Sequence, residues 1–217
     1  MKNILTSIFI STSIILTAQA QEDIKAKTIL DELSAKTKSY SSITAVFSYN
    51  LENKASKTNE TQEGKLFVKG NKYKLEIAGQ EVISDGKTVW TYLREANEVQ
   101  INNPPDASAQ DAVNPANLFT IYETGFQSKF DCEKVDGKKT FQHINLYPKD
   151  PKKKSYHTVK LTIDKQAKEI TNIKVLGKDG NDYTYSVRNF TPNQILKDDI
   201  FSFDKTKYPK IEVVDLR

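Results

Sequence analysis

An alternation of side chains decides the fold, and it is clearest over residues 45–52, Ala45-Val46-Phe47-Ser48-Tyr49-Asn50-Leu51-Glu52. The odd positions are occupied by Ala, Phe, Tyr and Leu, whereas the even positions are mostly polar. Successive side chains of a β-strand point to opposite faces, so this period of two predicts a strand with one buried face. The other strands of the chain are predicted by the same alternation.

The same period of two recurs outward from this stretch in runs joined by short turns. Asp85-Gly86 and Asp136-Gly137 are typical of hairpin turns. Because the links are short, an antiparallel meander is the simplest topology, and a sheet of this size tends to curl or close. The predicted strands are residues 45–52, 64–68, 72–77, 82–83, 88–93, 98–101, 126–135, 140–147, 157–164, 169–176 and 182–190, with 211–216 as a candidate last strand and 53–62 as a loop.

Two segments predict helices instead of strands. Residues 23–40 have an apolar face at helical spacing opposite a charged face, which predicts a helix that covers a core. Its apolar face consists of Ala26, Ile29, Leu30, Leu33, Thr37 and Tyr40. Residues 116–122 predict a short apolar helix that ends before Gly125, with Asn114 as its N-cap and Pro115 at its first position. Because this helix interrupts the strands, its simplest role is a lid over the sheet.

The first twenty residues read as a secretory signal peptide. Lys2 is followed by an uncharged run over residues 4–16 and by Ala18-Gln19-Ala20, which has the small-residue pattern of a cleavage site. The run is too short for a permanent membrane anchor. We expect cleavage after Ala20, and the next residue, Gln21, cannot carry the lipid that bacterial lipoproteins attach to cysteine. Residues 21–217 are therefore expected to form one exported, soluble domain.

Composition and motifs exclude most kinds of chemistry. The 217 residues include 32 Lys and Arg against 28 Asp and Glu, and a net charge of +4 is too small to indicate a nucleic-acid partner. The single cysteine, Cys132, is interpreted as a packing residue, and His143 and His157 lie away from other possible metal ligands. No phosphate-binding glycine loop or nucleophile motif is present in the sequence. We therefore expect no enzyme activity, no metal and no cofactor.

The apolar face of the sheet remains as the candidate functional feature, and two interpretations of it are open. Its aromatic and aliphatic side chains either fill a core or line a cavity for an apolar ligand, since curved sheets often hold ligands.

Four stretches along the first half of the chain resemble the LolA family, the periplasmic carriers that move lipoproteins from the inner to the outer membrane. They are Ala45-Val46-Phe47, Gly64-Lys65-Leu66-Phe67-Val68-Lys69, Lys72-Tyr73-Lys74-Leu75 and Ser84-Asp85-Gly86-Lys87-Thr88-Val89-Trp90-Thr91-Tyr92. The resemblance implies a half-open, incomplete β-barrel with helices covering its hydrophobic concave face. It also implies a carrier of acylated lipoproteins that is loaded by an inner-membrane lipoprotein-releasing transporter. The outer-membrane acceptor is left open, and we expect a monomer.

Strand parity and the resemblance together predict the residues of the site. The residues expected to bind acyl chains are Phe47, Tyr49, Leu51, Leu66, Val68, Tyr73, Leu75, Ile77, Trp90, Tyr92, Val99 and Ile101. The residues expected to form the lid are Leu30, Leu33, Leu118, Phe119 and Tyr122. The strand at Trp90 has two apolar faces, so Val89, Thr91 and Leu93 are an alternative to its assigned residues.

One departure from the family pattern concerns the latch of the lid. Carriers of the family have an arginine just after the strand at residues 64–69, whereas this chain has Gly70-Asn71 there. Lys69, Lys72 or Lys74 could partly substitute, although lysine lacks the planar five-donor fork of arginine. The alternative to a carrier is a sensor or regulator of the cell envelope that uses the same fold to bind lipid or lipoprotein.

Overall fold

The computed structural model describes residues 13–104 and 115–217, and twelve strands in these residues form one sheet. The strands are β1 (Ile43–Asn53), β2 (Thr58–Lys69), β3 (Lys72–Ile77), β4 (Gln80–Ser84), β5 (Val89–Leu93), β6 (Glu98–Asn102), β7 (Phe126–Asp136), β8 (Lys139–Pro148), β9 (Tyr156–Asp164), β10 (Glu169–Gly177), β11 (Asn181–Pro192) and β12 (Glu212–Asp215). Their order across the sheet is β12-β6-β5-β4-β3-β2-β1-β11-β10-β9-β8-β7. The prediction of a mainly β domain with one curved sheet is confirmed.

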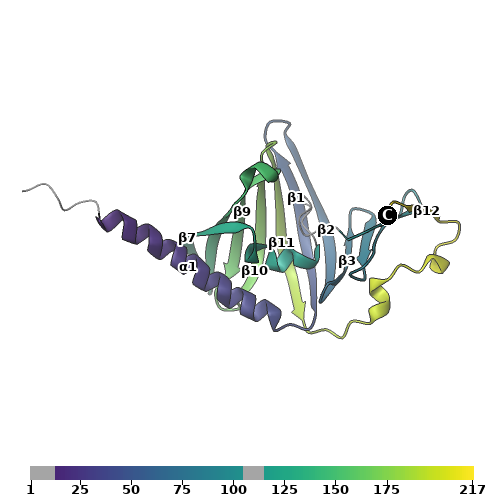
Figure 1. Cartoon of the computed structure of the whole chain (residues 1–217), viewed down its shortest axis with the longest axis horizontal. Coiled ribbons are helices and arrows are strands. Elements are labelled where there is room, and N and C mark those ends of the chain that lie inside the picture. Colours follow the sequence, from purple (N-terminus) through teal and green to yellow (C-terminus); the bar gives the residue numbers. More distant parts are fainter. Residues whose placement is uncertain (1–12, 105–114) are drawn as a thin grey trace, which may run out of the picture.

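The sheet is open, with β12 at one edge and β7 at the other. Neighbouring strands are antiparallel along the whole order except at the first edge, where β12 runs parallel to β6. Figure 1 shows the strands curving around a helix that crosses one side of the sheet. The half-open barrel that the resemblance implies is therefore observed.

The prediction of a loop over residues 53–62 is wrong at its second half, because β2 begins at Thr58. This end of the β1–β2 hairpin is held by polar groups. The Asn50 side-chain amide donates to Asn59 Oδ1 at 2.7 Å and to the Glu60 carbonyl at 3.2 Å. Residues 59–63 are exposed, so they lack the apolar alternation by which strands are recognised in sequence.

Two helices cover one face of the sheet, which we call the concave face (Figure 1). Helix α1 (Ser13–Lys38) contacts β7 and β10, and the 3₁₀ helix η1 (Pro115–Glu123) contacts α1, β3 and β7. The predicted apolar face of α1 is confirmed, since Ala26, Leu30 and Leu33 are buried in the main hydrophobic cluster. Residues 1–12, which carry most of the predicted signal peptide, and the predicted N-cap Asn114 lie outside the described residues.

The opposite, convex face is covered at the other end of the sheet by the segment that follows β11. This C-terminal segment contains the short 3₁₀ helices η3 (Asp198–Phe201) and η4 (Lys205–Lys207) before it reaches β12. Phe201 is fully buried, and the rings of Phe203 and Tyr208 stack with centroids 4.7 Å apart. The centroid of the Tyr92 ring lies 4.5 Å from that of Tyr208. The sheet is thus covered by helices on one face and by the C-terminal segment on the other.

Candidate functional site

The strand register brings most of the predicted binding residues onto the concave face. Phe47 pairs with Gly64, Gly64 pairs with Ile77, and Val68 pairs with Tyr73. Side chains of directly paired residues lie on the same face of a sheet. The predicted residues that share this face are Phe47, Tyr49, Leu51, Leu66, Val68, Tyr73, Leu75 and Ile77. Because β1, β2 and β3 are neighbours, these residues form one continuous surface.

The remaining four predicted residues lie on the convex face, which corrects the expectation for β5 and β6. Trp90 pairs with Ile83 and Ile101, and Tyr92 pairs with Val99. Ile83 in turn pairs with Lys74, which follows Tyr73 and therefore points away from the concave face. The four misplaced residues are Trp90, Tyr92, Val99 and Ile101. Alternation could not decide between the faces, because β5 is apolar on both sides, and its convex side is covered by the C-terminal segment.

The residues of β5 that do lie on the concave face are Val89, Thr91 and Leu93. Their position follows from the turn between β4 and β5. The Asp85 carboxylate accepts hydrogen bonds from the backbone amides of Lys87 and Thr88, each at 2.8 Å. Gly86 has a φ of +89°, and a Cβ there would collide with the Asn71 side chain. The Ser-Asp-Gly-Lys-Thr motif therefore builds a turn that packs against the β2–β3 turn.

The second half of the sheet, for which the sequence predicts no site residues, contributes much of the concave face. Tyr185 pairs with Tyr49 and Ile173, and Ile173 pairs with Leu161. The additional residues on this face include Ile144, Leu146, Val159, Leu161, Ile173, Val175, Tyr183, Tyr185, Val187 and Phe190. Their alternation is visible in the sequence, but the four stretches quoted for the resemblance lie between residues 45 and 92.

Aromatic side chains cluster where β1 meets β11. The Tyr49 ring centroid lies 5.3 Å from that of Tyr185 and 6.3 Å from that of Tyr183. The Phe47 and Tyr185 centroids are 6.2 Å apart. Burial raises the pKa of Tyr185 to about 12, and neighbouring Tyr49 and Tyr183 add to the shift. Burial also raises the pKa of Tyr49. The raised pKa values keep the phenols of Tyr49 and Tyr185 neutral at physiological pH, so both present a ring and an uncharged hydroxyl group.

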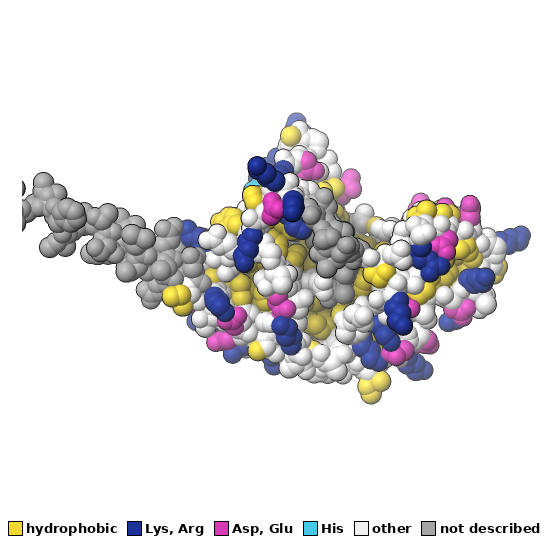
Figure 2. Space-filling model, in the orientation of Figure 1, with side chains coloured by type: hydrophobic (Ala, Val, Ile, Leu, Met, Phe, Trp, Pro, Cys, Tyr) yellow, Lys and Arg dark blue, Asp and Glu magenta, His cyan; other side chains and the backbone are white. Residues whose placement is uncertain are grey.

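The predicted lid residues lie against this face. Leu118, Phe119 and Tyr122 of η1 are buried in the same hydrophobic cluster as Leu30 and Leu33 of α1. The Phe119 ring meets the Phe190 ring edge-on, with centroids 5.3 Å apart. Figure 2 shows hydrophobic side chains gathered in the hollow between α1 and the β3 end of the sheet.

The lid is held to α1 by Glu123 at the end of η1. Glu123 Oε1 accepts a hydrogen bond from the Ser34 hydroxyl and lies 3.0 Å from Lys38 Nζ. Helix α1 is held to the sheet through Lys25, whose Nζ lies 3.7 Å from the centroid of the Phe130 ring. These contacts are near the surface, so each contributes only about 0–1 kcal/mol.

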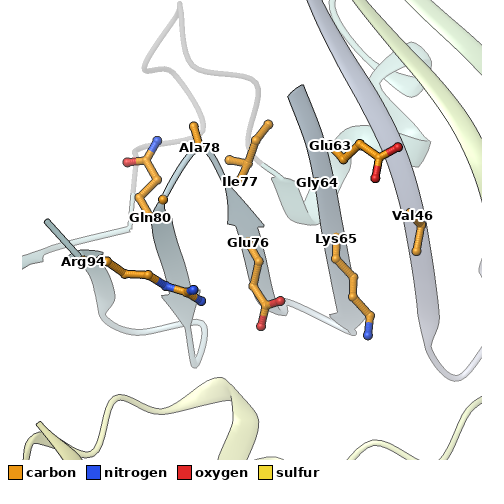
Figure 3. Close-up of a pocket in the computed structure, with 10 residues that line it drawn as sticks. Val46, Glu63, Gly64, Lys65, Glu76, Ile77, Ala78, Gln80 and Arg94 are labelled. Atoms are coloured by element: carbon orange, nitrogen blue, oxygen red, sulfur yellow. The ribbon is translucent and has the colours of Figure 1, made fainter. Parts of the chain in front are cut away.

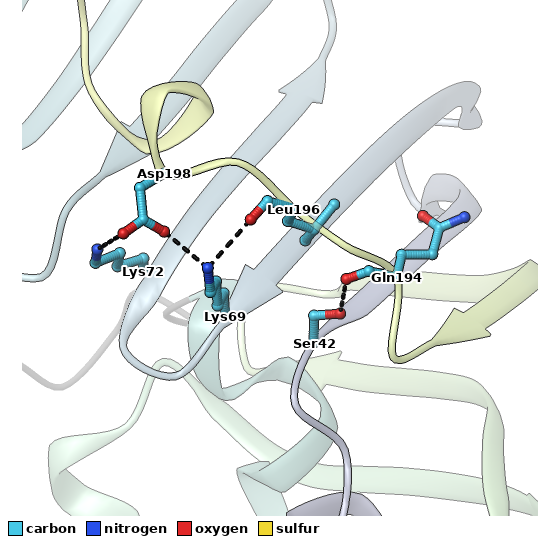
Figure 4. A network of polar contacts seen from close by, with 6 residues as sticks. All are labelled: Ser42, Lys69, Lys72, Gln194, Leu196 and Asp198. Atoms are coloured by element: carbon cyan, nitrogen blue, oxygen red, sulfur yellow. Dashed lines mark hydrogen bonds and ion pairs between the residues drawn. The ribbon is translucent and has the colours of Figure 1, made fainter.

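Within residues 13–104 and 115–217, none of the three lysines expected to replace the family arginine has an ion pair or hydrogen bond to α1 or η1, so that expectation is wrong for the described residues. Lys69 Nζ donates to Asp198 Oδ1 at 2.8 Å and to the Leu196 carbonyl at 3.1 Å, and Lys72 Nζ donates to Asp198 Oδ2 at 3.1 Å (Figure 4). Lys74 pairs with Glu76 and Glu81 on the convex face. These lysines hold the C-terminal segment and the convex face, not α1 or η1.

The charged convex face contains a pocket of about 330 Å³ at the β3–β4 turn, beside the middle of β2 (Figure 3). Its lining includes Lys65, Glu76 and Arg94. Arg94 Nη2 donates to Glu81 Oε1 at 2.6 Å. Burial opposes ionisation of Glu81, but hydrogen bonds from Lys74 and Arg94 hold its pKa below the ordinary value. This pocket is therefore a charged surface feature, unlike the concave face.

Metal binding is another kind of chemistry to which clustered side chains could point. No group of three or more His, Cys, Asp and Glu residues in the described part of the chain is placed to hold a metal ion. No helix among the same residues has the length and apolarity to span a membrane. A bulge in β7 places Cys132 opposite His143 on β8.

Comparisons with known proteins agree with this geometry. The family model described as outer membrane lipoprotein carrier protein LolA matches residues 38–204. An outer-membrane lipoprotein carrier protein of Pasteurella multocida is 34% identical over 130 residues, which is 58% of this chain and 57% of that protein's length.

Two solved structures show the same fold. An uncharacterized conserved protein from Thermus thermophilus has a TM-score of 0.56 at 13% identity, covering 88% of this chain and 99% of that one. A domain named as a putative outer membrane lipoprotein-sorting protein, from Vibrio parahaemolyticus, has a TM-score of 0.50 at 12% identity, covering 83% and 97%.

Proposed function

The chain belongs to the LolA family of outer-membrane lipoprotein carrier proteins, and from this premise we propose that it binds the acyl chains of lipoproteins and carries them from the inner to the outer membrane. The proposal places the protein in the periplasm as a monomer, with the signal peptide removed after Ala20. Its partners are acylated lipoproteins and an inner-membrane transporter that releases them. Its task is binding and release, without catalysis.

The observation that carries the proposal is the apolar part of the concave face, which is fully packed on β8–β10 and only partly covered at some positions of β1–β3. Its rows on β8–β10 are fully packed, with Ile144, Leu146 and Leu161 at 0% exposure. In contrast, Tyr49, Leu75 and Ile77 of β1–β3 are only partly buried against the same cluster. A sheet surface of this kind under a lid suits a flexible apolar ligand.

The strength of acyl burial limits how such a carrier works. Complete burial of three C16 chains, about 45 methylenes at about 0.8 kcal/mol each, corresponds to roughly 36 kcal/mol. Noncovalent affinity saturates near roughly 18–21 kcal/mol, and binding of that strength would prevent release. The carrier therefore buries only part of the chains and loses some affinity in opening its lid. Loading requires an external energy source, which the transporter supplies.

Acyl binding is tested by titrating the purified protein with a fluorescent fatty-acid probe and by mass spectrometry of copurified lipid. Phe47→Glu places a charge on the concave face and is expected to weaken binding at least tenfold. Val46→Glu places the same charge on the other face of the same strand and serves as the matched control. Because Phe47 is 3% exposed, Tyr49→Glu at a half-buried position is a second variant that preserves the fold. Absence of acyl-lipid binding by both methods refutes the carrier proposal.

The alternative, a lipid- or lipoprotein-binding sensor, differs in its consequence for the cell. Depletion of a carrier stalls lipoproteins in the inner membrane, whereas depletion of a sensor leaves their sorting intact. Membrane fractionation after depletion, with the location of outer-membrane lipoproteins as readout, separates the two functions.

A further inference from the structure

The concave face changes from apolar to polar along the β1–β2 ladder. The pairs run outward from the end of α1 as Ile43–Val68, Ala45–Leu66, Phe47–Gly64, Tyr49–Gln62, Leu51–Glu60 and Asn53–Thr58. The first three pairs are buried, whereas Gln62 and Glu60 are exposed. The lid lies over the apolar end, because Phe119 packs on Phe190, the β11 partner of Ala45. A ligand bound along these paired strands therefore contacts a buried apolar region at one end and a solvent-exposed polar region at the other.

Tyr49, Tyr183 and Tyr185 lie at the border between the two ends. Each is partly buried against the core, and their rings form one cluster. None of the three hydroxyl groups has a hydrogen bond to another described residue. None is a fully buried unpaired atom either, so each oxygen is accessible. Packing alone requires only phenylalanine here, whereas tyrosine adds three hydrogen-bond donors.

The chemistry of an acylated ligand matches this border. Its hydrocarbon chains have no hydrogen-bonding groups, and the first acceptors beyond them are the carbonyl oxygens of the ester bonds to glycerol. Burial raises the pKa of both Tyr49 and Tyr185. Their hydroxyl groups therefore stay protonated and able to donate over the physiological range.

We propose that the hydroxyl groups of Tyr49, Tyr183 and Tyr185 donate hydrogen bonds to the ester carbonyl oxygens of the ligand. This inference rests on the carrier function proposed above and adds an orientation to it. The methyl ends of the acyl chains lie toward Ile43 and Val68 beneath the lid, and the glycerol end lies at the tyrosines. The polypeptide of the lipoprotein then leaves past the exposed end of the β1–β2 hairpin, away from α1.

The test compares two lipids that differ only in the carbonyl groups. Dipalmitoylglycerol has ester bonds, and dihexadecylglycerol has ether bonds and the same chain length. Each is used to displace a bound fluorescent fatty-acid probe. One additional hydrogen bond contributes about 0.5–1.5 kcal/mol, so we expect the unmodified protein to bind the ester lipid about twofold to thirteenfold more tightly.

The triple variant Tyr49→Phe, Tyr183→Phe and Tyr185→Phe keeps the rings and removes the hydroxyl groups. It is expected to bind the ether lipid as the unmodified protein does and to lose the preference for the ester. Tyr147→Phe, at a position on β8 that is 39% exposed, is the matched control and keeps the preference. Equal binding of both lipids by the unmodified protein, or an ester preference that survives in the triple variant, overturns the inference. Failure of both lipids to bind refutes the carrier proposal itself.

Discussion

The close approach of Gly64 and Phe47 makes a quantitative prediction about the concave face. A Cβ atom added at Gly64 would lie 2.5 Å from Phe47 Cζ and 2.9 Å from Cε2. Carbon atoms pack at about 3.5–4.0 Å, so the added methyl overlaps the ring by about 1 Å. Phe47 is 3% exposed and has little room to move away. We therefore expect Gly64→Ala to destabilise the protein by about 1–3 kcal/mol, the usual cost of overpacking.

The cause of this loss can be isolated with a second substitution. Phe47→Leu removes Cζ and both Cε atoms, which are the atoms in the collision. It leaves a smaller core and is expected to destabilise the protein by itself, by about 1–2 kcal/mol. In the double variant the new methyl fits into the vacated space. The loss of stability in the double variant should therefore be smaller than the sum of the two single losses by about 1 kcal/mol or more. This difference is the coupling expected for residues in contact.

The assay is equilibrium unfolding in urea of the four proteins in this cycle, with the free energy of unfolding and its denaturant slope compared. A matched cycle combines Phe47→Leu with Ile163→Val, which lies three strands away on β9. Strands are about 4.8 Å apart, so this pair should be additive to within about 0.5 kcal/mol. Additive losses for Gly64→Ala and Phe47→Leu would refute the proposed collision.

Three further predictions concern the charged contacts. The pKa of Glu81 is held below 4.5 in the folded protein by hydrogen bonds from Lys74 and Arg94 against the effect of burial. The ionised Glu81 therefore stabilises the fold above the unfolded pKa of 4.5, and this stabilisation is lost as the pH falls through the lower folded pKa. In Glu81→Gln the free energy of unfolding should depend less steeply on pH in this acid range, as measured by circular dichroism. Glu123→Gln weakens the contacts of η1 with α1 and should raise the release rate of a bound acyl probe by up to about fivefold in stopped-flow displacement; an unchanged rate would show that the lid is held by packing alone. Asp198→Asn removes the ion pairs to Lys69 and Lys72 and should speed proteolysis of the C-terminal segment without changing acyl binding.

The strands of this fold were predictable because their buried faces alternate at short range. β3 was predicted with its bounds, and the face of β1 was predicted from Phe47 and its neighbours. The orientation of β5 could not be predicted, since Trp90 and Thr91 are both compatible with burial. Only the turn at Asp85 determines which of the two side chains lies on the concave face. The hairpin end from Thr58 was missed because its side chains are exposed.

Contacts between distant parts of the chain could not be predicted from the sequence. The partner of Lys69 is Asp198, 129 positions later, and nothing near Lys69 indicates it. The lid contact between Ser34 and Glu123 is of the same kind. Such pairs depend on the completed fold, whereas the period of a strand is a local property. The tyrosine cluster shows both effects. Its two strands, β1 and β11, were predicted from their alternation, but their pairing side by side in the sheet was not.

Helix α1 and the C-terminal segment lie at opposite ends and on opposite faces of the sheet, and this divides the protein into regions of different local stability. Hydrogen exchange reports the free energy of opening at each amide, which is highest where buried contacts are dense. Ile144, Leu146 and Val159 are at 0% exposure beneath α1, so we expect the amides of β8–β10 to exchange last. β4–β6 are short strands backed mainly by the C-terminal segment, and their amides should exchange orders of magnitude sooner. Ligands of different size would then be accommodated by movement of β4–β6, while the part of the sheet beneath α1 keeps its shape.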